Sequence, residues 1–216
     1  MSPSAVIGAN PFFFEANDYR LYRRPVAMAA RRAGTAIWAY CLMRNRVHLI
    51  VSPADAGWVA GDLCRSAPRY TGAINARFRW MGHPFQDRFG AVVMDEPHLL
   101  AAARYIALNP VVARLVSRAE DWPWSSARAH LAGEDDELAP VAPLRALIPD
   151  FAALLTAPAD PATTARIERA PTIGRPLGAP EWIAALERRL GRPLAPGKPG
   201  PKPRADGDTR QEPPLL

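Results

Sequence analysis

The sequence predicts an α+β domain built around an antiparallel sheet, and three observations lead to this class. Two runs rich in β-branched and aromatic residues, 35–43 and 46–51, are separated only by Arg44 and Asn45, and so short a connection joins antiparallel strands. Helical segments flank this hairpin without the regular strand–helix alternation of a parallel sheet. Of the 216 residues, 49% are hydrophobic and 22% are charged, a balance that permits a buried core.

The first expected helix covers residues 18–33 and ends at Gly34, with Pro25 predicted to kink or interrupt it. Successive side chains of the strand 46–51 lie on opposite faces of the sheet. Its residues Val47, Leu49 and Val51 should face the core, while Arg46, His48 and Ile50 share the opposite face.

The next elements are a long helical segment, about 56–80, and a bent strand or strand pair at 85–94. Asp95-Glu96-Pro97 is typical of a helix start, because the carboxylate can cap the helix and proline suits its first turn. This helix should reach Asn109 and stop before Pro110.

The chain contains 24 prolines, which from residue 171 onward recur every few positions among Gly, Arg and Lys. Such a composition buries too little apolar surface to offset its ordering entropy. We therefore expect a folded domain at 1–133, a partly helical extension at 134–190, and a disordered, basic, proline-rich tail at 191–216.

The formal net charge of +6 favours an anionic partner, most often nucleic acid and second a membrane surface. No apolar run approaches the length that spans a bilayer, and residues 1–14 lack the basic start of a signal peptide. Cys41 and Cys64 each lie in an apolar segment, so we expect reduced core residues and a cytoplasmic location.

Two pairs of residues carry candidate chemistry. His48 shares a strand face with Arg46, although a half-exposed strand face explains them equally well. Tyr105 and Asn109 are four apart on one helix face. A phenol can act as a nucleophile and a carboxamide oxygen can bind a hard cation, but a core tyrosine and a helix-ending asparagine remain alternatives.

Taken together, four segments in order resemble the REP-associated tyrosine transposases, which are single-tyrosine HUH enzymes. They are residues 40–51 (YCLMRNRVHLIV), 82–89 (GHPFQDRF), 105–116 (YIALNPVVARLV) and 121–126 (DWPWSS) with His130. Residues 174–178 (GRPLG) and the basic tail resemble the C-terminal extension of the same family. The likeness covers roughly residues 12–204.

This resemblance implies a ferredoxin-like antiparallel sheet flanked by helices, and a single-stranded or hairpin DNA partner without membrane attachment. It implies DNA cleavage and rejoining through a 5′-phosphotyrosine intermediate, assisted by Mg²⁺ or Mn²⁺. Tyr105 would be the nucleophile, and His48 and Asn109 would be metal ligands. A homodimer is compatible with it, because in related enzymes the tyrosine helix can serve a partner subunit.

The sequence departs from the family at two places. Arg46 occupies the position of the first metal-binding histidine, and a guanidinium has no lone pair to give a cation. We therefore expect DNA binding to persist and metal-assisted cleavage to be impaired; the alternative is a catalytically inactive, domesticated protein that binds structured DNA or RNA. At the start, only residues 8–10 (GAN) resemble the end of the family's first strand, so that strand should be short or missing.

Basic residues mark the expected DNA-facing surface. Arg46 could clamp a phosphate, and the family motif at 82–89 includes Arg88. The remaining candidates are Arg23, Arg24, Arg31 and Arg32 of the first helix, Arg65, Arg69, Arg77 and Arg79 of the long helical segment, and Lys198, Lys202 and Arg204 of the tail. Solvent-exposed basic helix faces and a polar linker are the alternatives.

Overall fold

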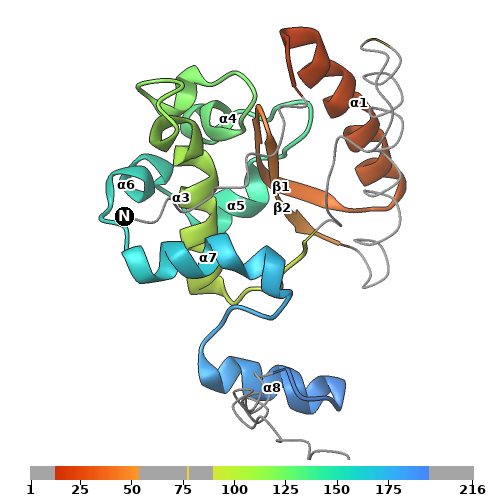
Figure 1. Cartoon of the computed structure of the whole chain (residues 1–216), viewed down its shortest axis with the longest axis vertical. Coiled ribbons are helices and arrows are strands. Elements are labelled where there is room, and N and C mark those ends of the chain that lie inside the picture. Colours follow the sequence, from red (N-terminus) through yellow and green to blue (C-terminus); the bar gives the residue numbers. More distant parts are fainter. Residues whose placement is uncertain (1–12, 54–76, 78–89, 195–216) are drawn as a thin grey trace, which may run out of the picture.

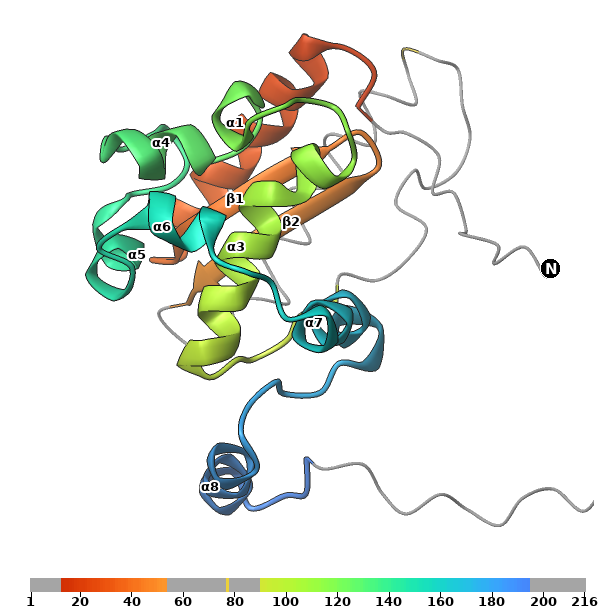
Figure 2. The same ribbon diagram turned by 90° about the vertical axis from the view of Figure 1, so that its left-hand side faces the viewer.

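The chain forms an α+β fold in which helices cover both faces of an antiparallel β-hairpin (Figures 1 and 2), which confirms the predicted class. The computed structural model describes residues 13–53, 77 and 90–194. In chain order the elements are α1 (Ala16–Arg32), β1 (Ala36–Met43), β2 (Arg46–Ser52), α3 (Glu96–Val112), η1 (Ala119–Asp121), α4 (Ala127–Ala132), α5 (Ala142–Leu147), α6 (Phe151–Thr156), α7 (Pro161–Ile173) and α8 (Pro180–Leu190).

The β1–β2 hairpin forms where the sequence predicts it, with Cys41 opposite His48 and Met43 opposite Arg46. The outer edge of β1 is paired as well. The amide of Leu42 donates to the carbonyl of Trp124 at 2.8 Å, and the amide of Ser126 donates to the carbonyl of Tyr40 at 3.0 Å. The segment that carries the two tryptophans therefore protects an edge that would otherwise expose unpaired backbone groups.

Helix α1 is continuous through Pro25, so the predicted interruption is absent. A buried carboxylate stabilises its start: Asp18 is fully buried and accepts hydrogen bonds from the amides of Phe14 and Glu15 at 2.8 and 3.0 Å. The guanidinium of Arg77 pairs with the same carboxylate at 2.8 Å. Arg77, expected on a DNA-facing surface, is thus engaged in the fold.

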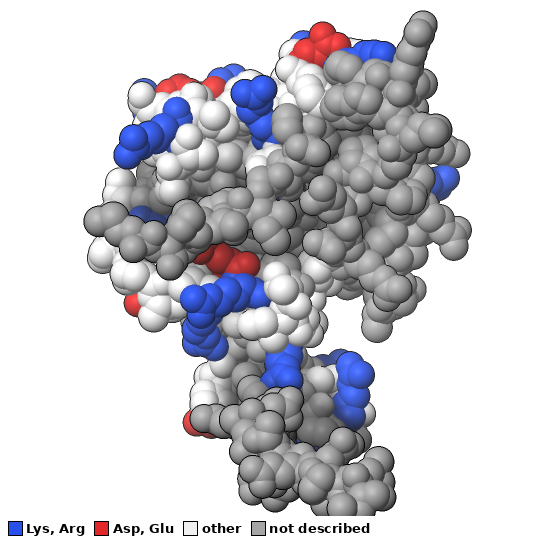
Figure 3. Space-filling view, in the orientation of Figure 1, with Lys and Arg blue, Asp and Glu red and all other residues white. Residues whose placement is uncertain are grey.

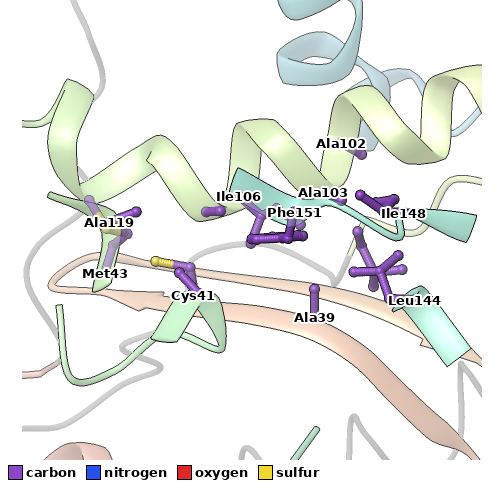
Figure 4. Close-up of a cluster of buried hydrophobic side chains, with 13 residues drawn as sticks. Ala39, Cys41, Met43, Ala102, Ala103, Ile106, Ala119, Leu144, Ile148 and Phe151 are labelled. Atoms are coloured by element: carbon purple, nitrogen blue, oxygen red, sulfur yellow. The ribbon is translucent and has the colours of Figure 1, made fainter. Parts of the chain in front are cut away.

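The hairpin separates two hydrophobic clusters. On the α1 side the cluster is aromatic, with Phe13, Tyr19 and Tyr40 buried. On the α3 side it consists largely of small residues, so that α3 lies close over the strands (Figure 4). The buried members of this second cluster are Ala39, Cys41, Met43, Ile50, Ala102, Ala103, Ile106, Ala107, Ala119, Ala127, Leu144, Ile148 and Phe151.

Helix α3 begins as predicted, with the Asp95 carboxylate accepting from the amide of His98 at 3.1 Å. The predicted stop before Pro110 is wrong, because the helix continues to Val112. Proline removes one backbone donor from the helix, but the Pro110 ring is fully buried. The apolar surface that this ring removes from water offsets the lost hydrogen bond.

Residues beyond the predicted boundary at 133 share the core, since Leu138 joins the α1-side cluster and Leu144 and Phe151 join the α3-side cluster. Within the predicted strand 85–94, residues 90–93 are not in a strand, and Met94 forms an isolated parallel bridge with Leu177. The predicted first strand, most of the helical segment 56–80, residues 85–89 and the tail from 195 lie outside the described residues.

Among the described helices, none is both long enough and apolar enough to cross a bilayer.

Candidate active site

His48 and Tyr105 face each other between β2 and α3. Their ring centroids lie 5.7 Å apart at an interplanar angle of 86°, an edge-to-face arrangement. Alternation along β2 places His48 on the same side as Ile50, which is buried beneath α3. Tyr105 precedes the buried Ile106 on α3 and packs at the margin of the same cluster.

Asn109 lies one helical turn after Tyr105 on the same face of α3. Burial raises the pKa of Tyr105 above its ordinary value, and the carboxylate of Glu168 raises it further. The nearby side chain of Asn109 and the positive charge of Arg46 act in the opposite direction. At neutral pH the side chain is therefore a phenol, held within a site that contains groups able to stabilise its anion.

The imidazole of His48 carries a buried polar atom that the fold leaves unused. Its Nε2 is inaccessible to solvent and has no hydrogen-bond partner among the described residues. Burial, together with the nearby charge of Arg46, lowers the pKa of His48 to about 4, so the ring is neutral at physiological pH. A buried imidazole nitrogen without a partner costs free energy, which is typical of a position kept for a ligand or for chemistry.

Arg46 is exposed at the start of β2, two residues before His48 and on the same strand face. Its charge influences both His48 and Tyr105, and it forms no ion pair within the described part of the chain. The guanidinium is therefore available to an anion that approaches the phenol.

Glu168 is a residue of this site that the sequence motifs did not indicate. It lies on α7, which packs against α3, and it follows Ile167, which contacts the α3-side cluster. Its carboxylate acts electrostatically on the phenol of Tyr105. Because α7 is distant from α3 in sequence and carries no recognisable motif here, only the folded structure identifies Glu168 as a residue of the site.

The residues present fit a divalent cation poorly. His48 Nε2 and the Asn109 carboxamide oxygen are suitable donors, but the guanidinium of Arg46, on the same strand face as His48, adds positive charge and no donor. Within residues 13–53, 77 and 90–194, no three His, Cys, Asp or Glu side chains come together as a metal site would require. Mg²⁺ needs several oxygen ligands in fixed geometry, so we derive no reaction step through a cation.

Of the other predicted DNA-binding residues, the four arginines of the first helix lie on α1, and Arg65, Arg69, Arg79, Arg88, Lys198, Lys202 and Arg204 lie outside the described residues. Their roles stay predictions. Trp122 and Trp124 pack as expected: the indole nitrogen of Trp122 donates to the carbonyl of Leu42 at 3.0 Å, and Trp124 stacks on Tyr19 with centroids 4.6 Å apart.

No protein-family model matches this chain, and no curated protein does. Among solved structures, the fold is similar to that of a REP-associated tyrosine transposase bound to a REP hairpin. The TM-score is 0.46 and the sequence identity 18%, over 57% of this chain and 73% of the other.

Proposed function

We propose that this protein binds single-stranded or hairpin DNA and is a transposase-like strand transferase in which Tyr105 is the nucleophile. The observation that carries the proposal is the contact between the His48 and Tyr105 rings, 5.7 Å apart, on elements whose sequence motifs resemble those of tyrosine transposases. A nucleophile on a helix, facing a strand that presents a neutral imidazole and an exposed guanidinium, is suited to phosphoryl transfer.

The proposed reaction exchanges one ester bond at phosphorus for another. The phenol oxygen of Tyr105 loses its proton and forms a bond to the phosphorus of a phosphodiester, while the bond from phosphorus to the 3′-oxygen breaks. The departing 3′-oxygen takes up a proton, and the 5′-phosphate remains on the tyrosine. Attack by another 3′-hydroxyl reverses the step and rejoins the strands without an external energy source, because the phosphotyrosyl ester conserves the bond energy.

Arg46 and Asn109 have distinct parts in this proposal. The guanidinium of Arg46 binds the non-bridging oxygens of the phosphate and offsets the negative charge that grows on them. Asn109, one helical turn from Tyr105, lowers the pKa of the phenol and so favours its anion. In the family, Mg²⁺ or Mn²⁺ supplies charge neutralisation; the poor donor set here makes cleavage slower than in an enzyme with two histidines.

The test is covalent capture. A hairpin oligonucleotide whose 5′ fragment, which ends in the free 3′-hydroxyl, dissociates after cleavage should accumulate a phosphotyrosyl adduct, detected by mass spectrometry, and Tyr105→Phe should abolish the adduct while leaving hairpin affinity unchanged. Tyr22→Phe, in the aromatic cluster on the other side of the hairpin, is the matched control. An adduct that persists in Tyr105→Phe excludes this nucleophile.

Arg46 favours a second candidate function, that of a binding protein which recognises structured DNA or RNA without cutting it. Restoring the histidine separates the two. Arg46→His should bind Mn²⁺ more tightly than the native chain in a calorimetric titration and should form adduct faster, by about tenfold or more, since one missing metal ligand is costly. If both proteins bind hairpin and neither forms an adduct, the binding function is the correct one.

A further inference from the structure

Helices α7 and α8 form a basic arm whose position is fixed by the body of the protein. Figures 1 and 2 both show α8 set apart from the other elements and joined through the segment after α7. None of the α8 residues is buried, so packing within the described residues does not account for this helix. Its sequence nevertheless ends in an ordered left-handed cap at Gly191, where φ is 64°.

The attachment of this arm is specific. The amide of Asp95 donates to the carbonyl of Leu177 at 3.0 Å, and the amide of Leu177 donates to the carbonyl of Val93 at 2.9 Å. The carboxylate of Asp95 accepts from the amide of Ala179 at 2.7 Å, directly before α8 begins. One residue therefore caps α3 and also positions the start of α8.

Close packing at Gly178 adds to this attachment. A Cβ at this position would lie 2.3 Å from the ring of Trp182, so only glycine allows the first turn of α8 to fold back on its own connection. Leu177 is 8% exposed. The segment that leads into α8 is thus anchored by hydrogen bonds to Val93 and Asp95, and Trp182 packs against this segment at Gly178.

The arm carries an excess of positive charge. Residues 161–194 contain six arginines and three glutamates, a formal charge of +3, and all six arginines are exposed. They are Arg166, Arg169, Arg175, Arg188, Arg189 and Arg192. Within the described part of the chain, these guanidinium groups form no salt bridges. Figure 3 shows basic side chains on α8 and on the edge of the body next to it.

This surface continues from the candidate active site. Helix α7 packs against α3 and brings Glu168 within electrostatic range of Tyr105. Arg166 and Arg169, three residues apart, share an exposed face of the same helix. A nucleic acid whose scissile phosphate lies at Tyr105 can therefore extend across α7 toward α8 with arginine on its path.

We propose that the arginines of the α7–α8 arm hold the sugar–phosphate backbone of duplex DNA, as in the stem of a hairpin. The inference rests on the proposed function, which supplies the hairpin. Exposed guanidinium groups contact phosphate without reading sequence, so the arm contributes affinity and orientation, and not base choice. A helix anchored at its start suits a rigid duplex, which cannot bend to follow a mobile segment.

The test measures the salt dependence of binding by fluorescence anisotropy, with a stem-containing hairpin and a single strand of equal length. Arg188→Gln/Arg189→Gln should weaken hairpin binding about tenfold and reduce the slope of log K against log salt by about 1.8, or 0.9 per lost phosphate contact. Single-strand binding should stay unchanged. Gly178→Val, which dislodges Trp182, should weaken hairpin binding in the same way.

The matched control is Arg118→Gln/Arg128→Gln, two exposed arginines outside the arm that contact Glu120, and it should leave the slope unchanged. The inference is overturned if Arg188→Gln/Arg189→Gln keeps the wild-type slope, or if the variant loses binding to phosphatidylserine vesicles and not to DNA. If Arg188→Gln/Arg189→Gln reduces the salt slope but the native protein never forms a Tyr105 adduct, the result supports DNA binding by the arm and refutes only the proposed cleavage.

Discussion

The two faces of the β-hairpin differ in what their polar groups do. On the α1 face, Asp18 pairs with Arg77, and the hydroxyl of Tyr40 donates to Asp136 at 2.5 Å. On the α3 face, the Nε2 atom of His48 is buried without a partner among the described residues, and Tyr105 is only partly buried. Asp18 and Tyr40 thus contribute to stability, although Arg23 Nε and Thr35 Oγ1 are also buried without a hydrogen-bond partner among the described residues. His48 and Tyr105 instead keep reactive groups available, which is where a folded protein departs from optimal stability.

Removing the Asp18 carboxylate should destabilise the α1 face of the hairpin and have the largest effect on the free energy of unfolding. Asp18→Ala removes the ion pair with Arg77 and two hydrogen bonds at the start of α1. We expect the free energy of unfolding to fall by about 3 kcal/mol, measured by urea denaturation. Glu15→Gln, at an exposed carboxylate that also contacts Arg77, should cost far less. Equal losses in the two variants would contradict a special role for the buried carboxylate.

A larger side chain in the close interface between α3 and the hairpin should have the next largest effect on the free energy of unfolding. Ala103 is 1% exposed between α3 and the hairpin, so Ala103→Leu forces the helix away from the strands. We expect a loss of about 2 kcal/mol in the free energy of unfolding and a decrease in adduct formation, because Tyr105 moves away from His48. Ala162→Leu, at an exposed position of α7, is the control. A variant as stable and active as that control would mean that close approach of α3 is unimportant.

Asp95 lies where α3 and the basic arm meet, and Asp95→Ala should cost about 1 to 2 kcal/mol at pH 7. Burial alone would raise the pKa of Asp95, but hydrogen bonds from His98 and Ala179 hold it below the ordinary value. A carboxyl with a lowered folded pKa stabilises the protein above its unfolded pKa, and this contribution is lost as the pH falls through the folded value.

The difference in stability between wild type and Asp95→Ala should therefore be constant from pH 7 to about 5 and should shrink below about pH 4. Thermal unfolding across this range is the measurement. Asp160→Ala, which removes the exposed cap of α7, should cause a smaller loss. A pH-independent difference would show that the carboxylate charge does not contribute to the junction.

His48→Phe should have the smallest effect on stability. It tests whether the α3 face keeps His48 for function and not for stability. Replacing the imidazole by an apolar ring removes a buried nitrogen that has no partner among the described residues, so we expect the free energy of unfolding to stay equal or rise by up to about 1 kcal/mol. Adduct formation should be lost. Ile50→Ala, on the same face of β2, should cost about 2 kcal/mol or more. If His48→Phe is equally destabilising, His48 is a packing residue.

The local sequence predicted the hairpin closely, because its two-residue connection and alternating pattern leave one antiparallel register. The start of α3 was also predictable, since Asp95 and Pro97 act within a single turn. The end of α3 was not predictable. Whether a proline ends a helix depends on whether its ring is buried, and the burial of Pro110 is a property of the folded chain.

The same distinction applies to the candidate site. Spacing grouped Tyr105 with Asn109 and Arg46 with His48, because residues two apart on a strand or four apart on a helix share a face whatever surrounds them. The roles expected of them came from the resemblance to the tyrosine transposases. Glu168 could not be found in this way. Its approach to the phenol depends on how α7 packs on α3, and no short-range pattern encodes that contact.

The sequence by itself therefore determined the fold class, the β-hairpin, the start of the tyrosine helix and the chemical character of the residues at the site, since each depends on neighbours along the chain. Only the tertiary structure decided that Arg77 serves the fold, that His48 Nε2 is buried without a partner among the described residues, and that Asp95 anchors the segment that leads into α8. The physical reason is that burial and pairing are properties of surfaces brought together from distant parts of the chain.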